Sequence, residues 1–223
     1  MTKKPKGVLD KNYAVGRTQK KSWQYRVKRR TQEAIESINQ FYSNNIESIL
    51  DIGAAEGLML SQLKRNYPQA KCVGLEYSQE LINLNQDKNI EIIQGDAHQL
   101  PFKDNSFDII IATAIIEHLD NPSQALKEAH RVLKKEGLII ITTPDPFFDK
   151  AAELFTKENF SHQETFNLKK LRSLLEENKF QVAEAKKFML SPIGLPAEKK
   201  IEKIIRFLKL DFTFLNQIII GRK

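Results

Sequence analysis

The residues best suited to chemistry lie in a short stretch, DIGAAEG, at positions 51–57. The apolar pattern around it predicts a strand over 48–52, a tight turn, and a helix over 56–66. Small residues in such a turn let a ligand approach the backbone, and the N–H groups that begin the helix point toward that ligand. Asp51 closes the strand, so its carboxylate is expected to reach into the same cleft.

The glycine spacing distinguishes two nucleotide cofactors that bind such a turn. A dinucleotide fingerprint requires G-x-G-x-x-G, in which the last glycine packs the helix on the strand beside a pyrophosphate. Here Gly53, Ala55 and Gly57 form the turn, and Leu58 stands where that last glycine belongs. This disfavours a nicotinamide oxidoreductase. An acid before the turn, Asp51, suits a cationic ligand, and S-adenosylmethionine carries a sulfonium and an ammonium group.

Two further acids follow the next predicted strands. Glu76 closes a strand over 70–75 and lies about 20 positions after Gly57, the offset at which an acid binds ribose hydroxyls in nucleotide folds. Asp96 follows a strand over 90–94. Ligands of parallel sheets bind at the carboxyl ends of the strands, so these acids and Asp51 are expected in one cleft.

These stretches resemble a known family. Residues 51–57 look like the nucleotide-binding motif of class I S-adenosylmethionine-dependent methyltransferases, with Ala55 replacing the usual middle glycine. Residues 95–102 are similar to the family's G-D-A-x-x-L-P-F segment, and 130–144 to its H-R-V-L-K-x-x-G-x-L-x-I-x-T-P run. The motifs extend over about half the chain and point to the methyltransferase type 11 group, which includes ubiquinone and menaquinone biosynthesis enzymes.

The resemblance implies a set of cofactor-binding residues. Asp96 is expected to bind the exocyclic amine of adenine, with the Ala97 backbone beside it. The full set that it implies is Asp51, Gly53, Ala55, Gly57, Glu76, Tyr77, Asp96, Ala97 and Thr113.

Methyl transfer from a sulfonium is an in-line displacement, in which positioning alone supplies up to about 7–11 kcal/mol. An alcohol or phenol acceptor gains further from a base. His118, in the segment after the fourth strand, is the first candidate base, and His162 is the second. The alternatives are that Glu117 and His118 only shape the loop and the cofactor pocket, and that His162 is a surface or structural residue.

Motifs that are missing from the sequence argue against several classes of methyl acceptor. DNA adenine methyltransferases carry D/N-P-P-Y/F after the fourth strand, where this chain has ATAI at 112–115. Cytosine-C5 chemistry needs a cysteine in the cleft, and Cys72 lies in the second strand. No acidic cluster for a catechol-type metal follows the fourth strand. We therefore expect O- or C-methylation of a small molecule, lipid or glycan, with neither nucleic acid nor metal. The alternative is a non-catalytic protein that binds S-adenosylmethionine or S-adenosylhomocysteine.

Strands that alternate with helices predict a doubly wound, Rossmann-like α/β sheet with helices on both faces. The resemblance adds seven strands in the order 3-2-1-4-5-7-6, the seventh antiparallel. The remaining strands are expected over 107–111, 138–142, 180–188 and 212–221. The remaining helices are expected from 22 to 42, after Ser78 with a core face of Leu81, Ile82 and Leu84, from 121 to a stop at Gly137, over 167–178, and over 197–209.

At 223 residues the chain fits one α/β domain with additions. We expect a basic arm and helix over 1–45, a methyltransferase domain over 46–223, and an inserted amphipathic helix within 191–209. Residues 1–30 hold eleven Lys/Arg and one acid. They form either a solvated tail, or an arm that orders over the active site or attracts an anionic substrate or surface.

The inserted helix has an apolar stripe, Ile201, Ile204, Ile205 and Leu208, among five Lys/Arg. The stripe either packs on its own domain or meets an amphiphilic substrate or an anionic membrane. Residues 143–165 are expected to form an irregular lid or substrate wall. A single cysteine, no signal-peptide core and no apolar run of about 20 residues predict a soluble, cytoplasmic protein, and leave its oligomeric state open.

Overall fold

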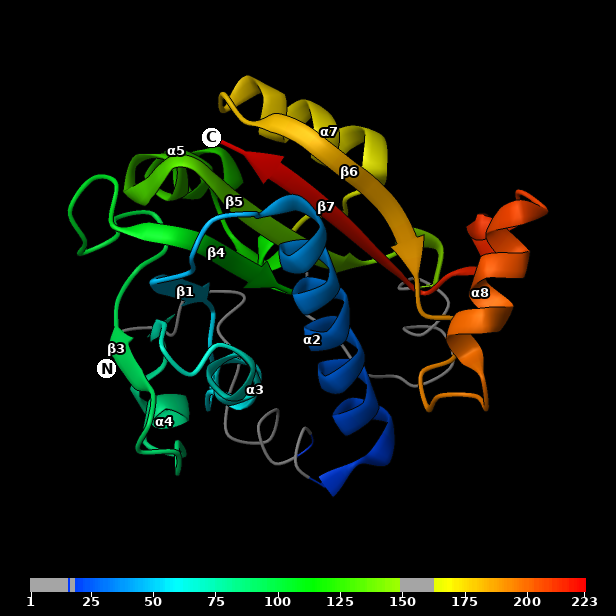
Figure 1. Ribbon diagram of the computed structural model, residues 1–223, viewed down its shortest axis with the longest axis horizontal. Coiled ribbons are helices and arrows are strands. Elements are labelled where there is room, and N and C mark those ends of the chain that lie inside the picture. Colours follow the sequence, from blue (N-terminus) through cyan, green and yellow to red (C-terminus); the bar gives the residue numbers. More distant parts are fainter. Residues whose placement is uncertain (1–15, 17–18, 149–162) are drawn as a thin grey trace.

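The computed structural model describes residues 16, 19–148 and 163–223. Its centre is a seven-stranded sheet in the order β3-β2-β1-β4-β5-β7-β6 (Figure 1). The strands are β1 Ser48–Ile52, β2 Lys71–Glu76, β3 Glu91–Gln94, β4 Phe107–Thr113, β5 Leu133–Pro144, β6 Gln181–Phe188 and β7 Asn216–Arg222. β7 is antiparallel to both neighbours, and the other pairs are parallel. The predicted doubly wound sheet and its strand order are confirmed.

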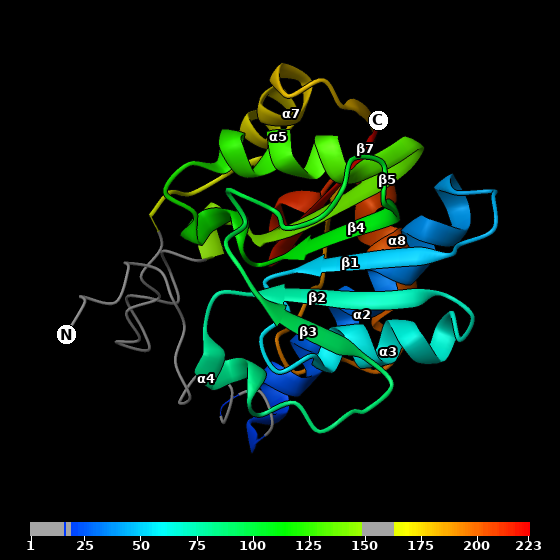
Figure 2. The same ribbon diagram turned by 90° about the vertical axis from the view of Figure 1, so that its left-hand side faces the viewer.

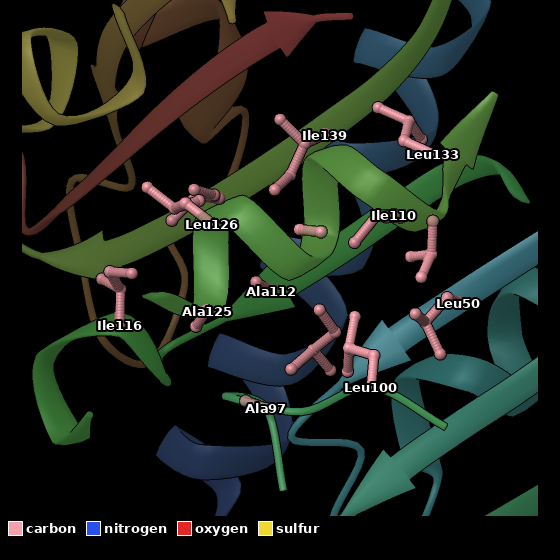
Figure 3. Packing of buried hydrophobic residues seen from close by; sticks show 14 of the residues in the cluster. Leu50, Ala97, Leu100, Ile110, Ala112, Ile116, Ala125, Leu126, Leu133 and Ile139 are labelled. Carbon is pink, nitrogen blue, oxygen red and sulfur yellow. The ribbon is translucent and has the colours of Figure 1, made fainter. Parts of the chain in front are cut away.

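Helices cover both faces of this sheet. They are α2 Lys21–Phe41, α3 Leu58–Asn66, α4 Gln79–Ile82, η1 Ile116–His118, α5 Pro122–Val132, α7 Leu168–Glu177, α8 Glu198–Phe207 and η2 Asp211–Thr213. Figure 2 shows α5 and α7 over one face and α2 and α3 over the other. Each face buries its own apolar cluster. Figure 3 shows part of the first, in which Leu126 of α5 is packed with Ile110 of β4 and Ile139 of β5.

The predictions for residues 1–22 and for the lid fall largely on residues 1–15, 17–18 and 149–162, which lie outside the described part of the chain. Among the described helices, none has both the length and the apolar character of a membrane span.

Two predicted helix boundaries are wrong. α3 begins at Leu58 rather than Glu56, because Gly57 precedes it in a left-handed conformation with φ +85°. α5 ends at Val132, and β5 begins at once, so Gly137 does not stop the helix. A Cβ at Gly137 would lie 2.8 Å from the Leu133 side chain and from the Lys134 carbonyl oxygen, and 2.9 Å from the Asp108 carbonyl oxygen, so this glycine allows close contacts within β5 and with β4.

The helix predicted after Ser78 is a single turn, α4, and only Leu81 of its expected core face is fully buried. The Ser78 side chain makes no capping hydrogen bond. Its backbone N–H instead donates to the Glu76 carboxylate at 2.9 Å. The contact with β2 thus takes the place of a helix cap.

The first six residues of β4 are all buried, and Asp108 is the charged residue among them. Its carboxylate accepts hydrogen bonds from the Tyr42 hydroxyl (2.9 Å), the Glu47 N–H (3.0 Å) and the Ser48 N–H (2.9 Å). The Ser48 hydroxyl (2.8 Å) and the Lys134 ammonium (3.0 Å) also donate to it. One buried carboxylate therefore joins the beginnings of β1, β4 and β5.

A helix, α8, lies in the region where the sequence predicts one over 197–209, and its orientation bears on the two alternatives for the apolar stripe. Its buried side chains are Glu198 and Glu202, whereas Ile204 is 59% and Leu208 56% exposed. Ile201 and Ile205 are partly buried, so its own domain covers only part of the apolar stripe.

We predict that Asp108→Asn lowers the free energy of unfolding at pH 7 by about 1.5–3 kcal/mol, the range for hydrogen bonds to a charged group. Burial alone would raise the pKa of Asp108, but the hydrogen bonds from Ser48, Lys134 and Tyr42 outweigh it and hold that pKa below its usual range. The stabilisation is thus present above the usual aspartate pKa and is lost as the pH falls through the lowered one. Urea unfolding across this pH range measures it.

The matched control is Asp104→Asn, which removes a largely exposed ion pair with Arg131 and should cost less than about 1 kcal/mol. A loss for Asp108→Asn that is equally large at pH 7 and in acid would contradict the role given to its charge.

Candidate active site

The turn after β1 is built from left-handed backbone. Gly53, Ala55 and Gly57 have φ of +77°, +50° and +85°. A Cβ at Gly53 would lie 2.5 Å from the Ile115 side chain, and one at Gly57 would lie 2.6 Å from that of Ile90. Glycine is thus required at both ends of the turn. Ala55 adopts its positive φ at a cost of roughly 1–2 kcal/mol.

The carboxylate of Glu76 holds this turn from the neighbouring strand. Its Oε2 accepts from the Ala55 N–H and its Oε1 from the Ser78 N–H, both at 2.9 Å. The N–H groups of Gly53 and Ala54 donate to the Leu75 carbonyl at 2.8 and 3.1 Å. The turn and the end of β2 therefore form one hydrogen-bonded unit, and the Glu76 side chain faces the turn.

Asp51 lies at the centre of the sheet, where β1 is paired on both sides. It is aligned with Gly74 of β2 and Ile111 of β4, and is only 2% exposed. A carboxylate so deeply placed sits beside the turn that begins two residues later.

Asp96 follows β3, the outermost strand on this side of the sheet. Its Oδ1 accepts from the His98 N–H at 2.9 Å and lies 2.6 Å from the His98 ring nitrogen Nδ1. The other ring nitrogen accepts from the Asn121 N–H at 3.3 Å, which ties this loop to the start of α5. Ala97 is buried, and Tyr77 is 47% exposed. His98 thus links the Asp96 carboxylate to the start of α5.

The segment after β4 packs on the glycine turn. Ile115 is the side chain that a Cβ at Gly53 would strike, and the Thr113 hydroxyl lies 3.6 Å from the Met59 sulfur of α3. Glu117 is buried, and His118 is partly buried at the end of η1. The Glu117 carbonyl accepts from the Gln163 N–H at 2.8 Å, so the chain before α7 returns to this loop.

The structure thus gathers the turn, Asp51, Glu76 and Thr113 where β1, β2 and β4 end, with Asp96 and Ala97 after β3 and His118 on η1. His162 lies outside the described residues. In the part of the chain that the structure describes, no group of three or more His, Cys, Asp or Glu side chains is arranged to hold a metal ion.

Sequence reasoning missed Asp145, directly after β5. It is 3% exposed, and its carboxylate lies 2.6 Å from the Lys187 ammonium of β6. It follows a buried strand just as Asp51 and Glu76 close theirs, and this shared pattern was available in the sequence. Buried Glu56 in the turn was also missed.

This geometry fits a nucleoside ligand with a cationic group. Gly53 and Gly57 have no side chain, so they pack closely against Ile115 and Ile90 and hold the left-handed turn beside the ends of β1 and β2. Asp51 supplies negative charge beside the turn, and Glu76 supplies oxygens that accept from hydroxyls.

The comparisons with known proteins also point to a methyltransferase. Residues 50–141 match the family model described as a methyltransferase domain. A demethylmenaquinone methyltransferase from Thermotoga maritima is 35% identical over 99 residues, which cover 44% of this chain and 43% of that protein. Malonyl-[acyl-carrier protein] O-methyltransferase 1 from Coxiella burnetii is 34% identical over 98 residues, covering 44% and 34%. The chain thus spans less than half the length of these curated relatives.

Among solved structures, a SAM-dependent methyltransferase from Thermotoga maritima has a TM-score of 0.67 at 22% identity, covering 95% of each chain. This likeness shows the fold. Residues 50–141 thus resemble a methyltransferase domain, and the sheet has the fold of S-adenosylmethionine-dependent methyltransferases.

Proposed function

We propose that the protein transfers a methyl group from S-adenosylmethionine to a small-molecule, lipid or glycan acceptor at the edge where β1, β2 and β4 end. The observation that carries this proposal is the left-handed turn 53–57, held by Glu76 and placed beside buried Asp51 within the matched domain. In this assignment Asp51 attracts the cationic methionine end, Glu76 accepts from the ribose hydroxyls, and Asp96 accepts from the adenine amine.

When bound, S-adenosylmethionine supplies an electrophilic methyl carbon on its sulfonium. The residues of this chain then have two tasks. The turn and its acids position that carbon in line with the acceptor atom, which is the larger contribution. His118 takes the proton of an acceptor hydroxyl as the new carbon–oxygen bond forms, while the electron pair of the broken bond stays on sulfur. A carbon acceptor that is already activated does not need this step.

Several observations support the acceptor class. Burial raises the pKa of Cys72 to about 11, so this thiol is not ionised near neutral pH and is unsuited to cytosine-C5 chemistry. The two named relatives act, by their names, on demethylmenaquinone and on a malonyl-[acyl-carrier protein]. O- or C-methylation of a metabolite, lipid or glycan is therefore favoured over methylation of nucleic acid.

A screen with methyl-labelled S-adenosylmethionine tests the proposal. Quinones, phenols, fatty acyl acids and sugars are each offered as acceptors, and transfer to one class supports it. Tight binding of S-adenosylhomocysteine with no transfer to any class favours the alternative, a non-catalytic protein that binds the cofactor and acts on a partner.

We predict that Glu76→Ala weakens S-adenosylhomocysteine binding by about 1.5–3 kcal/mol, because the ribose hydroxyls lose a charged acceptor. Since the Ala55 and Ser78 amides lose the same acceptor, the free energy of unfolding should fall as well. Calorimetry measures the affinity and urea unfolding the stability. Glu91→Ala removes an exposed glutamate at the start of β3 and is the matched control. Unchanged affinity in a folded Glu76→Ala protein would remove the ribose assignment.

Asp51→Asn keeps the shape of the side chain and removes its charge. We expect it to weaken binding of S-adenosylmethionine by about 1.5–3 kcal/mol, because the methionine end carries positive charge. Isothermal titration compares the two proteins. A thermal-shift series with NAD is the accompanying control and should show no stabilisation by NAD. Normal binding by Asp51→Asn would overturn the argument from charge.

His118→Asn separates the two interpretations of this residue. If His118 accepts the proton of the acceptor, its loss should lower kcat by about 10²–10⁴-fold and leave the cofactor affinity nearly unchanged. The pH-rate profile should also lose its acidic limb. A variant that loses cofactor affinity instead, with kcat preserved, would show that the residue only shapes the loop.

A further inference from the structure

The segment from Ile193 to Phe212 carries most of the exposed apolar surface. Of the nine large apolar side chains that are exposed in the described residues, seven lie in this segment. Phe207 is 86% exposed, Ile193 67%, Phe212 62% and Ile204 59%. A cluster of this kind on one segment marks an interaction site, because single exposed apolar residues are ordinarily scattered.

α8 is fixed with this face outward by the charges on its other side. Glu202, 1% exposed, accepts from Arg29 of α2 at 2.7 Å and from the Met189 N–H at 2.9 Å. Glu198 accepts from the Tyr25 hydroxyl and from the Leu190 N–H. Turning the helix to bury its apolar side would break this buried network, which is strongly unfavourable.

Exposed lysines outnumber the exposed acid Asp211 around α8. Lys200, Lys203 and Lys209 are exposed among the apolar side chains. A helix with a strong apolar face and lysines beside it is typical of segments that lie in the plane of a membrane interface. The same lysines argue against a second copy of this chain, because a two-fold interface would bring them opposite one another.

This segment also lies at the carboxyl ends of the parallel strands, where ligands of such sheets bind. Phe188, the last residue of β6, pairs with Asn216 of β7, and Asn216 pairs with Pro144, the last residue of β5. The chain between β6 and β7 therefore leaves the sheet where the parallel strands end. Figure 1 shows α8 beyond the tip of the β6 arrow.

We propose that this surface, called here the α8 face and made of Ile204, Phe207, Leu208, Phe212, Lys200 and Lys203, binds the interface of an anionic lipid bilayer. Its apolar side chains enter the boundary between headgroups and acyl chains, and its lysines meet the lipid phosphates. Apart from buried Arg29, ten Lys/Arg of residues 1–30 add positive charge to the same protein. Bound in this way, the carboxyl ends of the parallel strands lie close to the membrane, so an amphiphilic acceptor reaches the site without crossing water.

Co-sedimentation of the full chain with vesicles tests this surface without reference to methyl transfer. The probes are phosphatidylcholine vesicles and the same vesicles mixed with phosphatidylglycerol, each at low and high salt. The wild type should bind the anionic vesicles, and less at high salt. The double variant Phe207→Ser, Leu208→Ser should lower this binding about tenfold or more. The triple variant Lys200→Gln, Lys203→Gln, Lys209→Gln should lower the binding and also reduce its salt dependence.

Lys135→Gln is the matched control, since Lys135 is exposed near the start of β5, at the end of the strands opposite to α8. Thermal unfolding and S-adenosylhomocysteine affinity check that each variant is folded. Wild-type protein that ignores anionic vesicles, or variants that bind as well as wild type, would overturn the proposal. So would a dimer in sedimentation velocity that the Phe207→Ser and Leu208→Ser substitutions abolish, because it would assign the face to a second copy.

Discussion

The cofactor site depends on one carboxylate that reaches across from a neighbouring strand. A turn with three left-handed residues is costly for any chain, and most of all at Ala55, which is not a glycine. The bonds from the Ala55 and Ser78 amides to Glu76 offset that cost. A carboxylate has about four lone-pair sites, so Glu76 can hold the turn and still accept from ligand hydroxyls. The order of the turn and the binding of a ribose are therefore coupled through a single side chain.

Buried acids at the amino ends of the parallel strands have a different role from those at the carboxyl ends. At the amino edge, Asp108 is surrounded by donors from Tyr42, Ser48 and Lys134, and its charge stabilises the fold. At the carboxyl edge, Asp51 and Glu76 lie beside the left-handed turn. A parallel sheet permits this division because all its strands end at one edge, where ligands bind. Buried charge can thus be concentrated at both ends of the same strands without conflict.

Periodicity and the family motifs predicted the sheet, its order and most helices, because these depend on patterns within each segment. What failed depends on contacts between segments. Gly137 fits the local rule for a helix stop, yet it serves the approach of β5 to the Asp108 carbonyl. Asp108 interrupts an apolar run, and its donors come from β1 and β5, so nothing nearby in the sequence marks it as buried. The positions of Asp51 and Glu76 at the ends of β1 and β2 could be predicted, since an acid after a strand is a local signal, whereas Asp145 was missed although it follows the same rule.

The orientation of α8 shows the limit of amphipathic patterns most clearly. The sequence defines an apolar side and a charged side, but not which of them faces the domain. Arg29 decides this, 173 positions from Glu202. A buried guanidinium requires carboxylates, and Glu33 and Glu202 supply them. Burial would raise the pKa of Glu33, but the charge of Arg29 outweighs it and keeps that pKa below its usual range, so the pair stays ionised. Because Glu198 and Glu202 of α8 are needed inside, Ile204, Phe207 and Leu208 face outward, and an ion pair in the interior determines the character of the surface.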